Sequence, residues 1–334
     1  MEVGFTYDAK ADYPFDPNNP EKYAEFDSEE TLSDIENAIK SGGHEVVRIG
    51  KAAGLLEKVF MQKEKFDIVF NICEGVEGRN RESQTPAILE LLGVPYTGSD
   101  ALAMGLTLDK AVAKKVLSYH RVPTPEFVLV SSVNELGNFF LRYPVIVKPL
   151  QEGSSKGLSD DSVVRDFAHL KKQTEWLISN YNQPALIEEF ITGQEFTVAV
   201  IGNEKPQALP PVQIAISGKI DLEEDFYRHE RIYDDTIQYI CPAEINKKLE
   251  EKICQVTLDA YQALGCRDFG RIDLRVDKSG QPYVLECNPL PNLGRIDVFP
   301  LVSKALGISY NEIILRILDC ACLRYGLVSN AVYK

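Results

Sequence analysis

Two periods of apolar and polar residues alternate through the first hundred residues. Apolar runs at 3–7, 45–49 and 66–72 predict strands, and apolar residues at helical spacing over 28–41 and 85–92 predict helices. Glycines directly follow both helical segments, as is common at helix C-termini. Strands that alternate with helices predict a parallel α/β domain. No GxGxxG motif follows the first strand and no GxxxxGK[ST] motif occurs, which disfavours a Rossmann dinucleotide fold and excludes a P-loop.

From about residue 107 the pattern changes. A predicted helix over 108–119 ends before Val122-Pro-Thr-Pro125, a rigid connector that a helix does not continue through. The next segment predicts a mixed α+β unit, with strands at 127–130, 144–147, 185–189 and 195–201 and helices over 134–142 and 163–179.

The last third predicts two long helices on either side of a β-hairpin. An amphipathic helix covers 245–264, and the closing helix begins at the capping-box pattern Ser309-x-x-Glu312. Between them, 269–288 has the alternation of two strands, joined at the turn 277–280.

The hairpin carries the most informative side chains. Arg271, Asp273 and Arg275 share one face of its first strand, because side chains alternate along a strand. Folding the hairpin about residues 279 and 280 places Asp273 roughly opposite Glu286, with Cβ atoms about 5 Å apart. Asn288 lies on the same face as Glu286.

Two explanations fit these opposed acids. Oxygen ligands from Asp273, Glu286 and Asn288 suit a hard cation such as Mg²⁺. The alternative is a solvated sheet face on which nearby arginines neutralise the acids. A turn-rich loop follows at 289–294, and binding loops commonly leave rigid strands in this way, which favours the metal site.

Three further features suggest a site for phosphate. Lys148 ends a buried strand, and lysines are seldom fully buried without a partner. The loop 152–157 is rich in glycine and serine, so its backbone N–H groups are suited to wrapping an anion, although a flexible turn has the same composition. Lys110 is a second phosphate candidate, and a surface helix lysine is its alternative reading.

Composition narrows the class of protein. The 334 residues include 36 Lys and Arg against 50 Asp and Glu, a net charge of −14, which argues against a nucleic-acid or anionic membrane partner. No apolar run approaches the roughly 20 residues that span a bilayer, and we expect no secretory signal. The seven cysteines are odd in number and scattered, as in reduced core residues. We expect a cytoplasmic enzyme.

Taken in order, these motifs resemble the D-alanine–D-alanine ligases over roughly residues 66–320. The resemblance rests on LLGVPYTGS at 91–99, Asp109-Lys110, PVIVKP at 144–149, EGSS at 152–155, EFTV at 195–198, QYICPA at 238–243, GRID at 270–273 and LECN at 285–288. It implies an ATP-grasp fold in three domains: an N-terminal α/β substrate domain (1–106), a central lobe (107–190) and a C-terminal lobe with the metal site (191–334).

The resemblance also implies residue roles. Lys110, Lys148 and the loop with Gly153, Ser154, Ser155 and Gly157 are expected on the ATP phosphates. Glu188 with Glu189, Phe190 and Ile191 is expected on adenine, and Glu195 on ribose. Asp273, Glu286 and Asn288 are expected to hold about two Mg²⁺ ions, with Mn²⁺ as a substitute. Arg271, helped by Ser154 and by a backbone N–H near Asn292, is expected to serve catalysis.

The implied reaction is an amide-bond synthesis through an acyl phosphate, in cell wall biogenesis. Amino acids are the implied substrates, and these ligases are often homodimers. A ligase for another amino-acid pair and a non-catalytic ATP-binding scaffold are the alternatives. The four residues Arg271, Asp273, Glu286 and Asn288 argue against the scaffold, which has no need of them all.

The sequence departs from the family pattern in three places. The glycine-rich N-terminal motif with its ammonium-binding glutamate is absent; Glu25 is either its substitute or simply an acid near a helix N-terminus, where acids are favoured. Arg231 stands at a lysine position of the ATP site, and a forked guanidinium is not equivalent to an ammonium.

The third departure is in the loop after the hairpin. Asn292 replaces a glycine, and we expect it to keep the turn because asparagine tolerates the left-handed region. Asp297 replaces a serine that helps to hold the second substrate's carboxylate. An acid at this position repels a carboxylate, unless the positive charge of Arg295 makes the local charge favourable. The identity of the second substrate, D-alanine or another amino acid, is therefore open.

Overall fold

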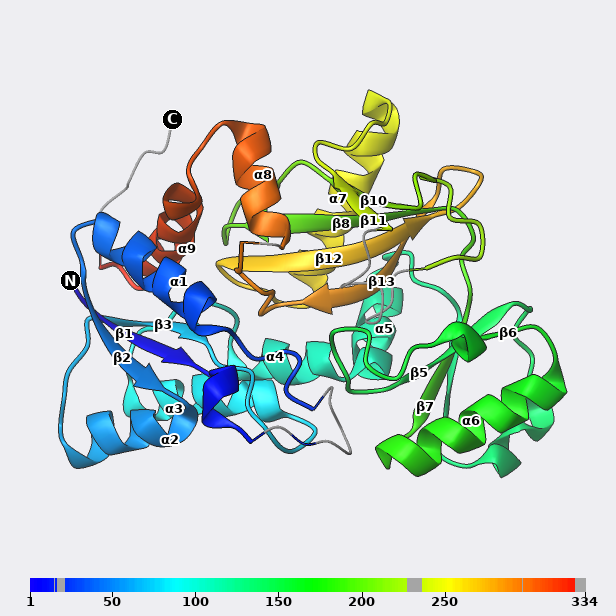
Figure 1. Ribbon diagram of the computed structural model, residues 1–334, viewed down its shortest axis with the longest axis horizontal. Helices are drawn as coiled ribbons and strands as arrows, with labels where there is room; N and C mark the ends of the chain where they lie inside the picture. The colour runs from blue at the N-terminus through cyan, green and yellow to red at the C-terminus, as the bar shows by residue number, and fades with distance from the viewer. Residues whose placement is uncertain (15, 17–21, 227–235, 296, 328–334) are drawn as a thin grey trace.

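The computed structural model describes residues 1–14, 16, 22–226, 236–295 and 297–327. Its first unit is built on a parallel sheet of β1 (Glu2–Tyr7), β2 (Glu45–Gly50) and β3 (Ile68–Ile72), in the order β2-β1-β3. Helices α1 (Glu29–Ser41), α2 (Ala52–Leu55) and α3 (Gln84–Leu92) accompany the sheet (Figure 1). The Ser28 hydroxyl caps α1 by accepting from the Thr31 N–H, as expected of a serine at an N-cap. The parallel α/β arrangement is confirmed.

The second unit contains an antiparallel sheet in the order β4-β7-β5-β6. Its strands are β4 (Phe127–Val130), β5 (Val145–Pro149), β6 (Val163–Val164) and β7 (Ala185–Glu189). Helix α6 (Phe167–Tyr181) packs against β5 and β7 and buries Leu170 and Leu177. Lys148 and Glu188 lie on the neighbouring antiparallel strands β5 and β7, where Lys148 pairs with Leu186 and Glu188 pairs with Ile146.

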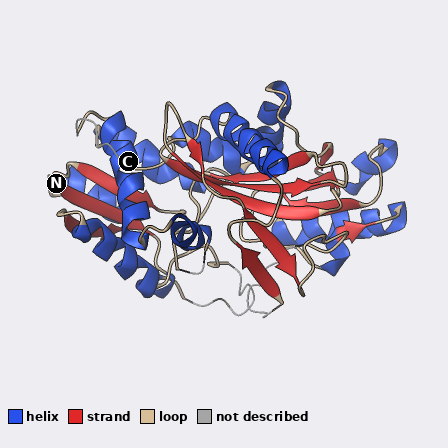
Figure 2. Ribbon diagram, turned by 90° about the horizontal axis from the view of Figure 1, so that it is seen from above, coloured by secondary structure: helices blue, strands red, loops and turns tan. Residues whose placement is uncertain are grey.

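The third unit holds the largest sheet, seen as the broad set of red strands in Figure 2. Its strand order is β11-β10-β8-β12-β13, with β9 paired to β8. Its strands are β8 (Gln194–Ile201), β9 (Gln207–Ala208), β10 (Val212–Ile216), β11 (Ile237–Ile240), β12 (Phe269–Val276) and β13 (Pro282–Asn288). Helix α7 (Lys247–Ala263) packs on one face, where Ile272, Leu274 and Val276 are buried. The opposite face of β12 therefore points its polar residues away from that core.

The chain then returns to the first unit. Helices α8 (Val298–Leu306) and α9 (Tyr310–Arg324) follow β13, and α9 lies beside α1 (Figure 1). One hydrophobic core includes Leu32 of α1, Phe70 of β3 and Ile317 of α9. Because the two ends of the chain share this core, the first unit is stabilised by the last helix.

Several predicted elements need correction. Asp109 interrupts the predicted helix 108–119: its side chain caps α5 (Lys110–Tyr119), and α4 (Ala101–Leu108) ends just before it. The segment 134–142 is not an α-helix, because only a 3₁₀ helix forms at Val133–Asn138. Within the predicted helix 163–179, β6 occupies the first two residues and Asp166 caps α6.

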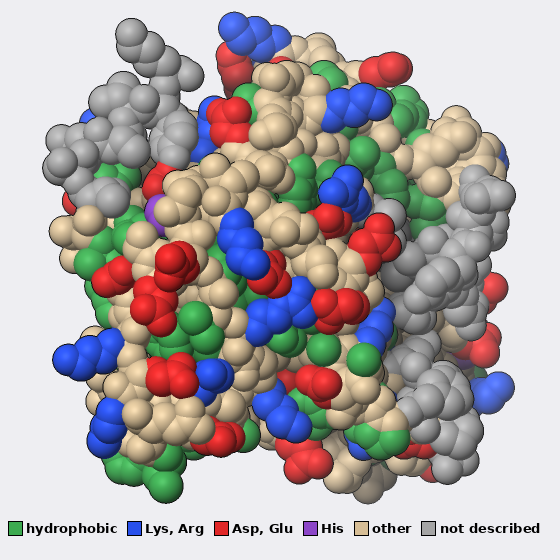
Figure 3. All heavy atoms as spheres, turned by 60° about the vertical axis from the view of Figure 1, so that its left-hand side comes forward, with side chains coloured by type: hydrophobic (Ala, Val, Ile, Leu, Met, Phe, Trp, Pro, Cys, Tyr) green, Lys and Arg blue, Asp and Glu red, His purple; other side chains and the backbone are tan. Residues whose placement is uncertain are grey.

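Several elements were not predicted. Among them, strands β10 and β11 extend the large sheet, α8 follows the loop after the hairpin, and α2, α4, β6 and β9 are short additions. No helix among the described residues has the length and apolarity needed to span a bilayer. On the face shown in Figure 3, acidic and basic side chains are interspersed.

Candidate functional site

A cavity of about 550 Å³ is lined by residues of all three units. The first unit contributes Glu25, Asp27, Glu74 and Glu82, and the second contributes Lys148, Glu188 and the loop residues 152–156, while Gly157 does not line the cavity. The third unit contributes Glu195, Arg271, Asp273, Glu286 and Asn288. Most of the residues that the sequence singled out therefore face one shared space.

The hairpin register at the cavity is the predicted one. Asp273 pairs with Glu286, and Arg271 pairs with Asn288. At the turn end, however, Val276 pairs with Pro282, and continuing that register would place Leu285 opposite Asp273. A β-bulge between Asp273 and Leu274 shifts the register by one residue, which brings Glu286 opposite Asp273.

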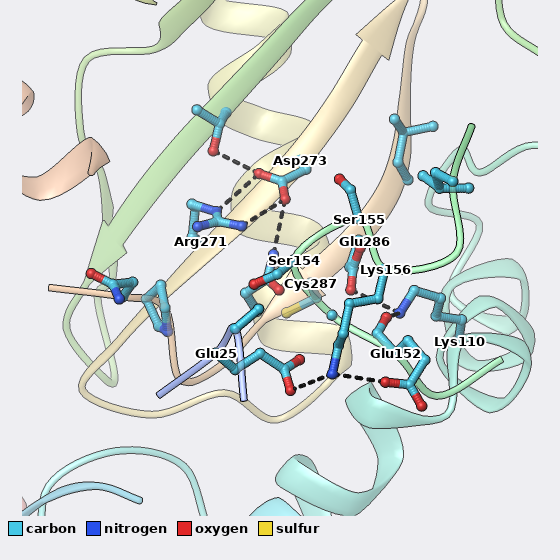
Figure 4. A pocket seen from close by; sticks show the side chains of 18 of the residues that line it. Glu25, Lys110, Glu152, Ser154, Ser155, Lys156, Arg271, Asp273, Glu286 and Cys287 are labelled. Atoms are coloured by element: carbon cyan, nitrogen blue, oxygen red, sulfur yellow. Dashed lines mark hydrogen bonds and ion pairs between the residues drawn. The ribbon is translucent and has the colours of Figure 1, made fainter. Parts of the chain in front are cut away.

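Protein cations hold both opposed acids (Figure 4). The Arg271 guanidinium donates to Asp273 from Nε at 3.1 Å and from Nη2 at 3.0 Å. Asp273 also accepts from the Thr197 hydroxyl at 2.6 Å and from the Asn288 amide at 2.9 Å. Glu286 forms an ion pair with Lys110 at 2.9 Å. Burial lowers the pKa of Arg271, but the nearby acids outweigh burial and raise it.

The donor set suits a magnesium ion. Asp273 and Glu286 are opposed on neighbouring strands and both line the cavity, so the two carboxylates attract cations to one place. Turning the Asn288 amide would add its oxygen to these carboxylates. Two carboxylates with an amide oxygen form the hard, oxygen-only set that Mg²⁺ prefers, so these residues fit the ion that the resemblance implies.

The second unit presents a buried group of three charges. Glu188 forms ion pairs with Lys148 at 2.5 Å and with Lys114 at 2.8 Å, and it is only 2% exposed. Burial raises the pKa of Glu188, but the two lysines outweigh burial and lower it. Burial lowers the pKa of Lys114 to about 8 in spite of the pull of Glu188. The sequence interpretation missed Lys114, which lies on an amphipathic helix and carries no local signal.

The remaining nucleotide candidates lie near this group. Phe190 and Ile191 line the cavity beside Glu188. Glu189 lines the cavity too, but its carboxylate forms an ion pair with the exposed Arg142. Glu195 lines the cavity, with its carboxylate 3.9 Å from Arg275. Arg231 lies outside the described residues.

The glycine-serine loop is tightly placed. Ser154 and Ser155 have φ values of 50° and 55°, and Gly157 has 76°, so three nearby residues adopt the left-handed region. A Cβ on Gly157 would lie 2.7 Å from Pro149 and 2.9 Å from the Tyr181 ring, whereas a Cβ on Gly153 would meet only the end of the Glu25 side chain. Gly157 is therefore needed, because its backbone is left-handed and the loop passes close to Pro149 and Tyr181.

Glu25 lines the cavity, so it is not simply an exposed acid near a helix N-terminus. Its carboxylate pairs with Lys156 at 2.9 Å and with Arg81 at 3.3 Å. Lys156 also pairs with Glu152 at 2.8 Å, and the Lys110 ammonium donates to the Glu152 carbonyl (Figure 4). Glu25 therefore connects the first unit to the loop of the second.

Sequence reasoning missed Lys156, Arg81, Glu74 and Glu82. A signal was available in CEGVEGRNRES at 73–83, a charged, glycine-containing run directly after a buried strand. Arg81 and Glu82 are each 8% exposed, although a charged run is usually solvated.

The loop after the hairpin differs from expectation in two ways. Asn292 keeps its turn without a positive φ, since its side chain accepts from the Gly294 N–H at 2.6 Å. Arg295 does not face Asp297, because it forms an ion pair with Asp34 on α1 and does not line the cavity. Asp297 lies 3.6 Å from Arg271 and caps α8, and burial raises its pKa.

Two solved structures have the same fold. The D-alanine–D-alanine ligase of Bacillus anthracis matches with a TM-score of 0.73 and 24% identity, over 97% of this chain and 98% of that one. The VanG D-Ala:D-Ser ligase of Enterococcus faecalis matches with a TM-score of 0.73 and 21% identity, over 96% and 99%. The fold is therefore the ATP-grasp fold, as expected.

Sequence relatives define the family. Residues 116–319 match the family described as the D-ala D-ala ligase C-terminus. The D-alanine–D-alanine ligase of Pelotomaculum thermopropionicum is 31% identical over 88% of this chain and 91% of its own length. The uncharacterized protein y4sG of Sinorhizobium fredii is 37% identical over 86% of each chain. The chain belongs to the D-alanine–D-alanine ligase family.

Proposed function

We propose that this protein is an ATP-dependent carboxylate–amine ligase of the D-alanine–D-alanine ligase type. The supporting observation is the hairpin that holds Arg271, Asp273, Glu286 and Asn288 in one cavity with Lys110 and Lys148. Relatives named D-alanine–D-alanine ligase cover most of the chain, and a structural neighbour of this fold is complexed with ATP. Two amino acids are the substrates joined.

The reaction proceeds in two steps. A carboxylate oxygen of the first amino acid attacks the γ-phosphorus of ATP, the bond from that phosphorus to ADP breaks, and an acyl phosphate forms. The amine of the second amino acid then attacks the acyl carbon, loses a proton, and phosphate leaves. ATP supplies the activation, since a bare carboxylate is a poor electrophile.

The chain's own residues would hold the reacting groups. Lys110 and Lys148 would attract the phosphates, and the loop 152–157 would close over them through its N–H groups. Arg271 would donate to the oxyanion that develops when the amine attacks. Asp273, Glu286 and Asn288 would hold Mg²⁺, which screens the triphosphate charge when bound.

The nucleoside end would lie against the second unit. Glu188 with the connector Glu189–Ile191 would contact adenine, and Glu195 would bind the ribose hydroxyls. Ser154 and a backbone N–H near Asn292 would assist catalysis. Their shared position on one cavity supports these assignments.

Several finer points belong to the proposal. About two Mg²⁺ ions, replaceable by Mn²⁺, are expected, and titrating ATP binding with each metal tests this.

We place the protein in the cytoplasm, consistent with its seven free cysteines. We also expect a homodimer, which sedimentation tests. We divide the chain at 1–106, 107–190 and 191–334, since each part contains one of the three sheets.

Phosphate release tests the activity directly. The full-length protein with Mg²⁺ and ATP should release phosphate only when amino acids are added, and D- and L-amino acids are screened singly and in pairs. Mass spectrometry of the product should show the dipeptide. ATP binding without phosphate release for any pair would contradict the proposal and favour a non-catalytic ATP-binding protein.

A further inference from the structure

Two acidic side chains in the cavity stand apart from the others. Glu74 follows β3 by two residues, and Glu82 lies in the 3₁₀ turn Arg81–Ser83 that leads into α3. Both line the cavity; Glu82 is 8% exposed and Glu74 is partly buried. Within the described part of the chain, neither carboxylate has a hydrogen-bond or ion-pair partner.

The neighbouring acids are paired by contrast. Glu25 is held by Lys156 and Arg81. Glu286 is held by Lys110, and Asp273 by Arg271. An unpaired buried carboxylate is costly, because burial removes water without supplying a replacement. An unpaired carboxylate at a cavity wall is suited to binding a ligand that supplies its missing hydrogen-bond donor or positive charge.

The charge of the whole cavity favours a cationic partner. Its described lining includes eleven acidic and six basic residues. Two Mg²⁺ ions would roughly cancel the charge of ATP, and an amino-acid zwitterion adds no net charge. The excess of acids therefore remains in the loaded site and favours a positive group close to the unpaired carboxylates.

We propose that Glu74 and Glu82 form an ammonium-binding subsite for an amino-acid substrate. This inference rests on the proposed ligase function and assigns the substrate amine to these two residues, because Glu25 is already neutralised. The ammonium comes either from the α-amino group or from the side chain of a diamino acid. In both cases its donors satisfy the two carboxylates.

The titration of the pair agrees with this assignment. Burial raises the pKa of Glu82 to about 7, with Arg81 and Lys110 opposing the rise and Glu25 and Glu286 adding to it. Burial and the charge of Glu82 also raise the pKa of Glu74, with Glu25 and Asp27 facing it too.

Calorimetric binding tests the subsite without requiring turnover. The full-length protein, saturated with Mg²⁺ and a non-hydrolysable ATP analogue, is titrated with alanine, norvaline, 2,4-diaminobutyrate and ornithine as D and L forms. Glu82→Gln and Glu74→Gln should each weaken amino-acid binding about 10- to 100-fold, the usual loss for a hydrogen bond to a charged group. Affinity for the ATP analogue should stay within about twofold of the wild type, which also reports that the variants fold.

Glu77→Gln is the matched control, because Glu77 lies on the same segment but is exposed. It should bind every ligand as the wild type does. Diamino acids that bind more tightly than neutral ones, with the difference lost in Glu82→Gln, identify the side-chain ammonium. Equal losses for both classes identify the α-ammonium.

Wild-type affinity in both glutamine variants, or no amino-acid binding by the wild type, would overturn the subsite. Amino-acid binding that depends on Glu74 and Glu82 without phosphate release would keep the subsite and reject the ligase function. The two failures are therefore distinguishable.

Discussion

Replacing Glu188 with glutamine removes the negative charge that two buried lysines share. Lys114 is 1% exposed and Lys148 is 8% exposed, so the ammonium of Lys114 has little access to water. Removing one partner of a buried ion pair typically costs about 3–5 kcal/mol. A lysine can limit this cost by losing its proton, and its pKa in the folded protein determines how much of the cost is avoided.

Lys114 sets the size of the effect. Burial has lowered its pKa from 10.5 to about 8 in the presence of Glu188. At about 1.36 kcal/mol per pKa unit, this depression already costs roughly 3 kcal/mol in the wild type. Without Glu188 the pKa falls further, and because Lys114 loses its proton at pH 7, only about one more pKa unit adds to the cost. Lys114 therefore adds at most about 1 kcal/mol, and with the weakened hydrogen bonds we expect a total loss of about 2–4 kcal/mol.

The pH dependence gives a second signature. The folded pKa of Lys114 lies below its unfolded value, so between pH 8 and 10.5 the unfolded chain binds more protons and stability rises with pH. In Glu188→Gln this window extends down to pH 7 or lower. The difference in stability between wild type and variant should therefore shrink by about 1 kcal/mol from pH 7 to pH 8.

The chain's single tryptophan reports this unit, because Trp176 lies on α6, which packs against β5 and β7. Urea unfolding is followed by its fluorescence at pH 7 and pH 8. Glu189→Gln is the control, since its ion pair with Arg142 is exposed and should matter little. A loss no larger than that of the control, or an equal loss at both pH values, would refute the reasoning.

Three more variants test other parts of the structure. Glu286→Gln should abolish amino-acid-dependent phosphate release with unchanged circular dichroism, because it removes a metal carboxylate; full activity would contradict the metal assignment. Arg271→Lys should lower kcat about 10²- to 10³-fold with little change in the KM for ATP, since an ammonium lacks the fork that binds Asp273; an unchanged kcat would exclude a role at the oxyanion. Asp268→Asn should cost about 3 kcal/mol in thermal denaturation, because Asp268 is fully buried, pairs with Arg324 and accepts from the Gly98 N–H; an unshifted Tm would argue against this contact.

The parts of the site that the sequence predicted are local ones. Alternation along 269–288 placed Asp273 opposite Glu286, because a hairpin turn limits the possible registers to a few. The sequence did not predict the β-bulge that makes this register possible, because the bulge arises where the register set at the turn differs from the register at the far end of the strands. The break between α4 and α5 was missed because Asp109 serves as an N-cap inside a run that keeps helical periodicity.

The missed parts depend on contacts between distant segments. Glu25 and Lys156 are 131 residues apart, and nothing near either residue indicates the other. Lys114 and Glu188 are paired through a helix and a strand that meet only in the folded chain. Periodicity predicts which face of an element is buried, but it does not predict which charges meet across a cavity.

The charges around Glu25 show why a role transferred by position needs the surrounding structure. An ammonium at Glu25 would have to displace Lys156 or share the carboxylate with it and with Arg81. Glu82, one residue from Arg81, has no partner among the described residues and lines the same cavity. Because attraction for an ammonium depends on uncompensated negative charge, the electrostatics assign the substrate amine to Glu82 and Glu74, even though Glu25 has the position that the family pattern suggests.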